Sequence, residues 1–412
     1  MPRALVVADD LTGATDTAHA FAKRGYGTTV RVDPDSEPNA SVLAVNTDSR
    51  YADPETAAER VRRVVRGTDA PVVYKKVDST LRGNVASEVD AAMERFDRGL
   101  FAPAAPAVGR LTACSHHLVD GCLLTDTEYA NDPNPPASAR LPALFEGLDR
   151  PVRHLGIGAV AAGPDAVRGV LDDVPPGSVI ACDATHERHL VAIARAGRES
   201  DRRPLYAGSS GLAEHVAVPG EPDRKPGFEY AAGGALGVVG SVSERSLEQL
   251  AALPEEWVIA IGPEELLSDP EGAGREAGRR TADRLAAGEH AVVTAAPDRE
   301  AVERTLELGH ERGLDGEAIR ERVTAALASA ARAGCGEAAG LFVTGGDIAM
   351  AAFDALGVRA LSLSGVEVEA GIPVSRLDGG CADGLPVVTK AGGFGSDATV
   401  INCLRALGGD HE

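Results

Sequence analysis

The chain has 412 residues, of which 44% are hydrophobic, 25% charged and only 4% aromatic. A single hydrophobic core rarely grows beyond ~250–300 residues, so this length predicts two domains. The net charge of −21 argues against a surface for nucleic acid or anionic membrane, and we expect neither as a partner.

No apolar run approaches the ~20 residues of a membrane span, and the first residues form a strand pattern rather than a signal peptide, which predicts a cytoplasmic protein. Abundant acid with scarce lysine is typical of halophilic proteins, because salt screens the self-repulsion, and we expect such a source. The six cysteines contain no C-x-x-C pair, so a metal cluster or a disulfide framework is not expected. The sequence identifies no metal ligands.

The first chemical stretch begins the chain. Ala4–Ala8 reads as a buried parallel strand, Asp9 and Asp10 follow it, and Ala14–Lys23 reads as a helix. Ligands of open α/β sheets bind at the carboxyl ends of strands. A helix cap needs one acid and not two, so we interpret the pair as functional, with capping by Asp10 as the alternative.

The second chemical stretch follows the strand Val72–Val77. Alternation along that strand places Lys76 and Asp78 on one side and Lys75 on the other. With Arg82 on the next turn, these groups suit an anionic ligand, while the alternative is a buried Lys–Asp pair. Residues 1–103 alternate strands and helices as in a parallel, doubly wound sheet, with further strands expected at Thr28–Val32, Val42–Asn46 and Leu100–Ala102 and helices at Glu55–Arg66 and Val85–Arg95.

The middle of the chain is less regular. Residues 118–124 predict a hairpin with an Asp-Gly turn, and residues 125–136 an acidic surface loop. The segment Gly156–Ala161 matches G-x-G-x-x-A, with Asp183 near the spacing of a ribose-binding acid. This match supports an alternative function, that of an NAD(P)-dependent dehydrogenase of a small hydroxy acid.

Residues 219–234 are rich in Pro, Gly and charge and are predicted to link a domain of residues 1–218 to one of residues 235–412. The second domain alternates strands and helices again. Three of its strand-to-helix turns, at 240–243, 344–347 and 392–396, carry Gly with Ser or Thr. If their strands are neighbours, the turns could surround a polyphosphate. The alternative is that α/β turns need glycine anyway.

Five motifs together resemble the four-carbon acid sugar kinase family, which includes 3-oxo-tetronate, threonate and erythronate kinases of carbohydrate metabolism. They lie in the family's order at residues 9–17, 75–84, 103–110, 344–347 and 390–395. The resemblance implies two α/β domains with mainly parallel sheets, an N-terminal acid-sugar-binding domain and a C-terminal nucleotide-binding domain. It places the active site in the cleft between them.

The resemblance also implies roles for single residues. The acid sugar would be bound by Asp9, Asp10, Lys76, Asp78 and Arg82, with Arg82 on its carboxylate. ATP would be bound by Ser241 or Ser243, by Gly345, Gly346, Asp347 and Ile348, and by Gly392 and Gly393. Family members often have Thr where this chain has Ile348, and Cys where it has Val242.

The expected reaction is transfer of phosphate from ATP to the terminal 4-hydroxyl of a four-carbon sugar acid, with Mg²⁺ on the ATP phosphates. Asp10, Asp78 and Asp347 are alternative candidates for the base that takes the hydroxyl proton. A non-catalytic sugar-acid-binding protein is a further alternative. The sequence does not fix the epimer, the oxidation state of the acid or the oligomeric state, for which a homodimer is our expectation.

Overall fold

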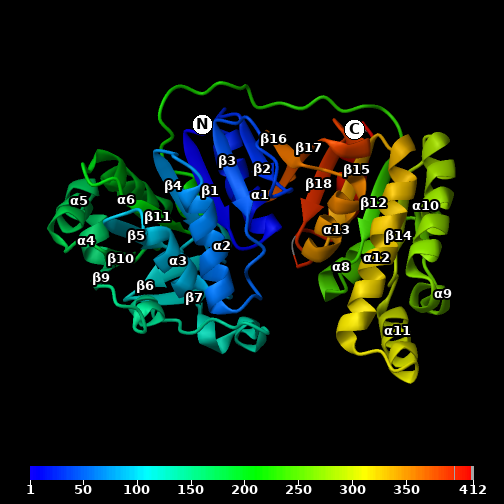
Figure 1. Cartoon of the computed structure of the whole chain (residues 1–412), viewed down its shortest axis with the longest axis horizontal. Coiled ribbons are helices and arrows are strands. Elements are labelled where there is room, and N and C mark those ends of the chain that lie inside the picture. Colours follow the sequence, from blue (N-terminus) through cyan, green and yellow to red (C-terminus); the bar gives the residue numbers. More distant parts are fainter. Residues whose placement is uncertain (394, 410–412) are drawn as a thin grey trace. The chain divides into compact units, whose positions relative to one another are not determined.

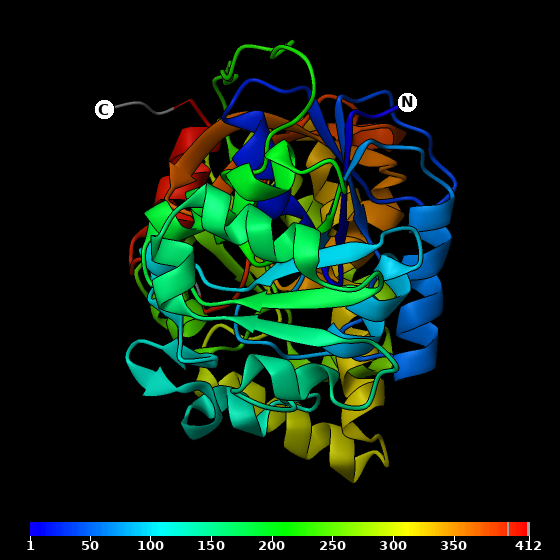
Figure 2. The same cartoon turned by 90° about the vertical axis from the view of Figure 1, so that its left-hand side faces the viewer.

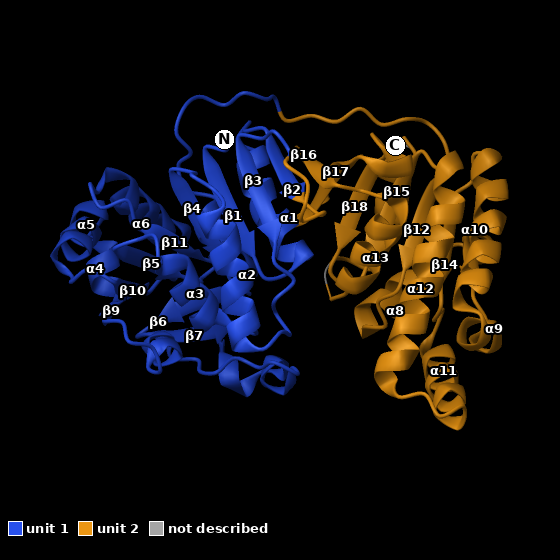
Figure 3. Cartoon of the chain, viewed as in Figure 1, with its two compact units in different colours: residues 1–30, 38–225 blue, residues 31–37, 226–412 orange. Residues whose placement is uncertain are grey.

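The structure is a computed structural model that describes residues 1–393 and 395–409 (Figure 1). The chain divides into two compact units, one of residues 1–30 and 38–225 and one of residues 31–37 and 226 onward (Figure 3). Each unit consists of a largely parallel sheet with helices on its faces. The predicted fold class, two α/β domains with mainly parallel sheets, is confirmed. No helix in the described part of the chain has the length and apolar content that a membrane crossing requires.

The sheet of the first unit is parallel from β3 to β9 (Figure 2). Its strands lie in the order β2 (Thr28–Arg31), β3 (Val42–Asn46), β1 (Ala4–Ala8), β4 (Val72–Lys76), β11 (Leu205–Gly208), β5 (Arg98–Ala102), β10 (Ser178–Cys182) and β9 (Val152–Leu155). Because β3, β1 and β4 are parallel neighbours, the residues that follow them leave the same edge of the sheet together.

Helices cover both faces of this sheet. Val61 and Val65 of one helix and Val89 and Met93 of another belong to a single core with alternate strand residues such as Leu5. These helices are α2 (Pro54–Arg66) and α3 (Val85–Met93). The other face carries α1 (Leu11–Ala22), α4 (Ile157–Ala161), α5 (Pro164–Asp173), α6 (Glu187–Glu199) and α7 (Ser210–Ala213).

A separate antiparallel sheet contains β6 (Arg110–Ala113), β7 (His116–Val119) and β8 (Cys122–Leu123). The predicted Asp-Gly turn is confirmed, since Asp120 and Gly121 join β7 to β8 with φ angles of 50° and 85°. Two positive φ angles are what a two-residue hairpin turn of the favoured kind requires.

The sheet of the second unit is parallel over its first five strands and ends in an antiparallel pair. The order is β13 (Val258–Ala260), β14 (Ala291–Thr294), β12 (Ala235–Val239), β15 (Gly340–Thr344), β18 (Pro386–Lys390), β17 (Ile372–Asp378) and β16 (Ala360–Glu369). The helices are α8 (Glu244–Ala251), α9 (Pro263–Ser268), α10 (Pro270–Ala286), α11 (Arg299–Glu311), α12 (Gly316–Gly334), α13 (Gly346–Leu356) and α14 (Thr399–Leu407).

Some elements differ from the predicted ones. The segment before Gly156 contains Arg153 and His154 and reads poorly as a buried strand, yet it forms β9. The reason is its place at the sheet edge, where one side of a strand faces solvent and no continuous apolar run is needed. The helix expected at Val85–Arg95 ends at Met93.

The contact between α10 and α12 gives a prediction about stability. A Cβ at Gly274 would lie 2.1 Å from the carbonyl oxygen of Ala326, whereas one at Gly169 in α5 would meet nothing within 4 Å. Ala normally stabilises a helix by ~0.5–1 kcal/mol relative to Gly, and we expect this gain for Gly169→Ala. Gly274→Ala should instead lower the free energy of unfolding by about 1–3 kcal/mol, because the helices must move apart. Urea denaturation of both variants tests this, and a stabilised Gly274→Ala would contradict the close packing.

Candidate functional site

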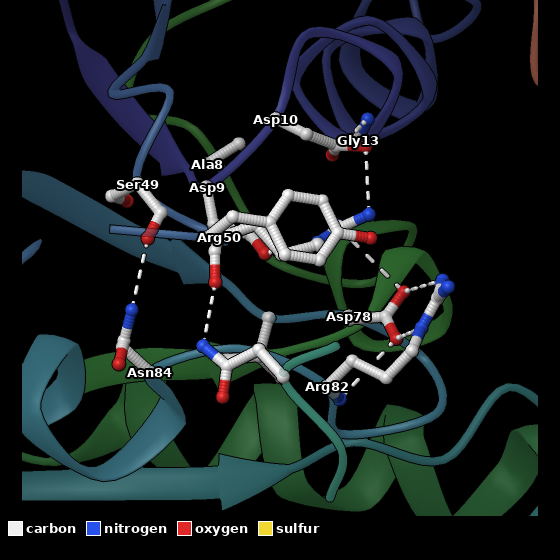
Figure 4. Close-up of polar contacts among 12 residues, drawn as sticks. Ala8, Asp9, Asp10, Gly13, Ser49, Arg50, Asp78, Arg82 and Asn84 are labelled. Carbon is white, nitrogen blue, oxygen red and sulfur yellow. Dashed lines mark hydrogen bonds and ion pairs between the residues drawn. The ribbon is translucent and has the colours of Figure 1, made fainter. Parts of the chain in front are cut away.

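The site of the first unit is built around the guanidinium of Arg50 (Figure 4). Its Nε lies 2.7 Å from Asp9 Oδ2, its Nη1 3.0 Å from Asp10 Oδ2 and its Nη2 3.8 Å from Asp78 Oδ1. The three carboxylates follow β1 and β4, and Arg50 follows β3, so three neighbouring strands contribute. One cation therefore holds together the two acidic stretches that the sequence singled out.

Asp9 and Asp10 have different local roles. The Asp10 side chain accepts a hydrogen bond of 2.8 Å from the backbone N–H of Gly13 and caps α1. It is also 30% exposed, whereas the Asp9 side chain is only 3% exposed and points to Arg50. The capping alternative is therefore correct for Asp10, but it does not account for Asp9 or for the contact between Asp10 and Arg50.

The loop after β4 folds around a second ion pair. Arg82 Nε and Nη2 donate to the two oxygens of Asp78 at 2.7 and 3.1 Å, and Arg82 Nη1 lies 3.2 Å from Asp132 Oδ2. Leu81 has a φ of 56° and Gly83 one of 83°, and a Cβ at Gly83 would come within 3.2 Å of the Arg50 side chain. The loop thus presses against Arg50, with Arg82 held by two carboxylates.

Burial and ion pairing shift the pKa values of the three acids in different directions. Burial would raise the pKa of Asp9, but Arg50 and then Lys75 hold it below its usual value. The pKa of Asp78 is likewise lowered, because Arg50 and Arg82 outweigh the effect of burial. The pKa of Asp10 is raised, because burial and the neighbouring Asp9 charge outweigh Arg50. Asp10 is therefore the most basic of the three.

The two lysines of β4 lie on opposite sides of the strand, as predicted. Lys75 is fully buried and lies 2.8 Å from Glu88 Oε2. Lys76 is 5% exposed, and its Nζ donates to the carbonyl of Val77 at 2.9 Å. No carboxylate lies within ion-pair distance of Lys76 among the described residues. The predicted alternative of a buried Lys–Asp pair thus does not describe Lys76.

Sequence reasoning missed three contributors to this site. Arg50 stands four residues after β3, and the rule applied to β1 and β4 would have found it there. Asp132 lies in the acidic loop, where nothing marks one acid above its neighbours. The Nε2 of His117 donates to the carbonyl of Ser79 (2.8 Å), its Nδ1 accepts from Thr112 Oγ1 (3.1 Å), and burial lowers its pKa to about 4. Neutral His117 thus ties the hairpin sheet to the site loop.

The second unit brings its three glycine turns together. The strands β12, β15 and β18, which precede the turns, are adjacent and parallel. Gly240 N donates to Thr344 O at 3.2 Å, and Gly345 N donates to Lys390 O at 3.4 Å. The condition placed on these turns, that their strands lie side by side, is met.

Small residues are required where the turns meet. A Cβ at Gly392 would lie 2.2 Å from Ser241 Oγ, and Ser246 Oγ donates to the carbonyl of Gly392 at 2.9 Å. Ser243 caps α8 by accepting from the N–H of Ser246. Gly345 has a φ of 103°, which only glycine adopts readily. Gly346 and Asp347 are exposed at the N-terminus of α13, where unpaired N–H groups favour an anion.

Ile348 of the predicted nucleotide site and Lys390 of the motif at 390–395 are both engaged in contacts within the protein. The side chain of Ile348 is only 6% exposed and packs against Gly240, so it belongs to the core, and only the backbone of residue 348 is left for a ligand. Lys390 donates to the carbonyls of Ala391 and Gly392 at 3.0 Å, and burial lowers its pKa to about 8. Phe394 of the same motif lies outside the described residues.

The dinucleotide match at Gly156 has a structural explanation of its own. Asp183 Oδ2 accepts from the N–H of Ile157 at 3.1 Å, and Asp183 Oδ1 accepts from Ser115 N and lies 2.9 Å from His154 Nε2. The carboxylate thus occupies the start of the short helix α4, where a pyrophosphate would have to bind. This arrangement argues against a nicotinamide cofactor here.

Comparison with protein families divides the chain as the two units do. A sugar-binding N-terminal domain matches residues 4–216, and a nucleotide-binding C-terminal domain matches residues 236–400. The chain is 34% identical to a D-threonate kinase of Salmonella typhimurium, covering 97% of each protein. It is 33% identical to a 3-oxo-tetronate kinase of Methylobacterium radiotolerans, covering 94% of the chain and 95% of that protein. A D-erythronate kinase of Heliobacterium modesticaldum is 28% identical, covering 99% of the chain and 97% of that protein.

A solved structure from Salmonella typhimurium, described as a putative tRNA synthase, superimposes with a TM-score of 0.82. It is 22% identical and covers 98% of this chain and all of its own. A Haemophilus influenzae protein gives a TM-score of 0.77 at 20% identity, with the same coverage. At these identities the two structures show that the fold is shared.

The arrangement around Arg50 predicts how stability depends on pH. In Arg50→Met, three buried or half-buried carboxylates lose their shared cation, and breaking such a cluster costs about 3 kcal/mol at pH 7. Without the cation, burial raises the folded-state pKa values of Asp9 and Asp10 above their unfolded values. The folded state then binds protons more tightly than the unfolded state, so the deficit shrinks as pH falls.

Urea denaturation at pH 7 and pH 5 measures this difference. Arg62→Met is the control, because Arg62 pairs with Glu59 and Glu94 at the surface and its loss should cost less than ~1 kcal/mol. An Arg50→Met deficit that equals the control, or that grows as pH falls, would refute the shared-cation description.

Proposed function

The chain belongs to the four-carbon acid sugar kinase family, and we propose that it transfers phosphate from ATP to the terminal 4-hydroxyl of a 3-oxo-tetronate, threonate or erythronate. The observation that carries the proposal is the similarity to kinases of these acids over 94–99% of the chain. The two sites described above supply what such a reaction needs, a cation-bearing acidic site for a sugar acid and a set of N–H donors for polyphosphate.

For the sugar acid, we assign Asp9, Asp10, Lys76, Asp78 and Arg82, and we add Arg50. The carboxylate of the substrate needs a cation. Arg82 was the first candidate, but Asp78 and Asp132 already hold its guanidinium. Lys76 has no such carboxylate partner in the described chain, so we propose Lys76 as the carboxylate-binding group, with the acids accepting from the sugar hydroxyls.

For the base, the structure favours Asp10 over Asp78. Asp10 is the more exposed of the two, and its raised pKa makes it the stronger proton acceptor. Asp78 accepts two hydrogen bonds from Arg82 and has a lowered pKa. Asp347, exposed in the first turn of α13, is the remaining alternative.

For ATP, we propose that the turns carrying Ser241, Ser243, Gly345, Gly346, Asp347, Gly392 and Gly393 bind the phosphates, with the backbone of Ile348. The support is the convergence of these turns beneath the N-terminus of α13. No cluster of three His, Cys, Asp or Glu that could hold a metal occurs in the described residues. We therefore propose that Mg²⁺ arrives on the ATP phosphates and neutralises their charge, as is usual for this ion.

The first experiment is a coupled assay of ADP formation with D- and L-threonate, D- and L-erythronate and the matching 3-oxo acids. We expect turnover with one acid that exceeds turnover with the others, in the presence of Mg²⁺. ADP formation that is independent of every acid would contradict the proposal, and so would stabilisation of the fold by a nicotinamide cofactor but not by ATP.

The base is tested by Asp10→Asn, Asp78→Asn and Asp347→Asn. Asn still caps a helix, so Asp10→Asn should keep the fold while removing the proton acceptor. We expect kcat to fall ~10²–10⁴-fold with little change in KM for Asp10→Asn. If Asp10→Asn keeps wild-type kcat and Asp347→Asn loses it, the base is Asp347.

We also propose that the protein works in the cytoplasm. All six cysteines are free thiols, and ATP is the donor, both of which fit the cytoplasm. For the oligomeric state, we propose a homodimer.

The net charge of −21 supports a halophilic source. The Debye length falls from ~10 Å at 0.1 M salt to ~3 Å at 1 M, so we expect a higher melting temperature in KCl at ~1 M than at ~0.1 M. A neutral osmolyte of equal osmolality is the control. Equal melting temperatures at both salt concentrations would count against this proposal.

A further inference from the structure

A fully buried ion pair lies beneath the acid-sugar site. Lys75 on β4 and Glu88 on α3 are 0% and 2% exposed, and Lys75 Nζ lies 2.8 Å from Glu88 Oε2. The ammonium also donates to the carbonyl of Lys76 at 2.5 Å and to that of Val7 at 3.4 Å. None of the roles proposed above uses this pair.

The pair is the start of a chain of polar contacts that crosses three strand ends. Glu88 Oε1 accepts from Ser49 Oγ at 2.5 Å, Ser49 Oγ lies 2.7 Å from Thr47 Oγ1, and Thr47 Oγ1 donates to the carbonyl of Ala8 at 2.8 Å. Ser49 N also donates to the carbonyl of Asp9 at 3.0 Å. The chain therefore touches the backbone directly before or at Asp9, Arg50 and Lys76.

Stability alone is a poor explanation for this pair. A buried ion pair is often no more stabilising than two apolar side chains of similar size, because both charges lose their hydration. Val85 and Val89, which flank Glu88 on α3, belong to the apolar core of the unit. Two charges at this depth are better explained by what they do to the groups above them.

The pair also acts on Asp9 through space. The charged groups around Asp9 are Arg50 from the loop after β3, Lys75 and Lys76 from β4, Asp10 from the cap of α1 and Glu88 from α3. Lys75 lowers the pKa of Asp9, second only to Arg50 among the cations. Without Lys75, Asp9 would hold its proton to a higher pH and its attraction for Arg50 would weaken.

We propose that Lys75 and Glu88 are positioning residues for the phosphoryl transfer proposed above: Glu88 holds the loop of Arg50 through Ser49, and Lys75 holds the end of β4 through the carbonyl of Lys76. Neither residue touches the substrate. The inference rests on the proposed function, since it assigns a role in that reaction.

The test compares two single variants with an apolar double variant. Glu88→Gln and Lys75→Met each leave one buried charge without its partner and should lower the melting temperature. Lys75→Met/Glu88→Leu removes both charges, and its melting temperature should return toward that of the wild type. In all three variants we expect kcat/KM for the sugar acid to be about 10–100-fold below that of the wild type, because Arg50 and Lys76 are no longer held in position.

A structural pair would behave differently. If activity returns with stability in the double variant, the positioning role is wrong. Glu94→Gln, at the C-terminal end of α3, is the matched control, since Glu94 pairs with Arg62 and Arg66 at the surface, and it should change neither value. The acidic limb of the kcat/KM profile is a further readout: in Lys75→Met it should move to higher pH, and an unmoved limb would contradict the effect on Asp9.

Failure of this inference can be told from failure of the proposed function. If the wild type forms no ADP with any acid, binding of threonate is measured by calorimetry in the wild type and the double variant. Equal affinities of the two proteins for threonate would overturn the positioning role, whereas weaker binding by the double variant would support that role in substrate binding. If threonate does not bind to the wild type, both the positioning role and the proposed function are overturned. The KM for ATP should be unchanged throughout, because the pair lies in the first unit.

Discussion

The contact of one guanidinium with three carboxylates organises the site that we propose for the acid sugar. Arg50 joins Asp9 and Asp10, which follow β1, to Asp78, which follows β4, and the three acids would repel one another without it. The cluster exists only because β3, β1 and β4 are parallel neighbours, so that their carboxyl ends meet at one edge. Burial opposes Arg50 at each acid: Arg50 and the neighbouring cations prevail at Asp9 and Asp78, whose pKa values are lowered, whereas burial and the Asp9 charge prevail at Asp10, whose pKa is raised.

In the second unit, too, the carboxyl ends of neighbouring parallel strands meet at one edge of the sheet. Among the described residues, those that follow these strands are small and carry no charged cluster like that around Arg50. Adjacent strands β12, β15 and β18 end in turns of small residues, and the phosphate donors that we propose there are backbone N–H groups instead of side-chain cations. A Cβ at Gly392 would clash with the Ser241 side chain, and a Cβ at Gly240 would clash with the Ile348 side chain, so both positions require glycine. The departure at Ile348 is therefore a packing feature, and the loss of a hydroxyl there leaves the exposed residues Gly346 and Asp347 unaffected.

Much of this could be predicted from the sequence, for physical reasons. Parallel strands buried on both faces read as continuous apolar runs, so Ala4–Ala8 and Val42–Asn46 were predictable to the residue. The edge strand β9 was not, because its exposed side tolerates Arg153. Asp9, Asp10 and Asp78 stood out as acids after apolar runs. Arg50 and Asp132 did not, because their importance depends on which strands are neighbours and on where a loop returns.

The central claim is that the terminal hydroxyl of a four-carbon sugar acid receives the phosphate. Phosphorus NMR of the product, formed from ATP and the preferred acid, tests it most directly. The account predicts a phosphate monoester signal split into a triplet by the two protons on carbon 4. A doublet from a single proton on carbon 2 or 3, or inorganic phosphate alone, would contradict it.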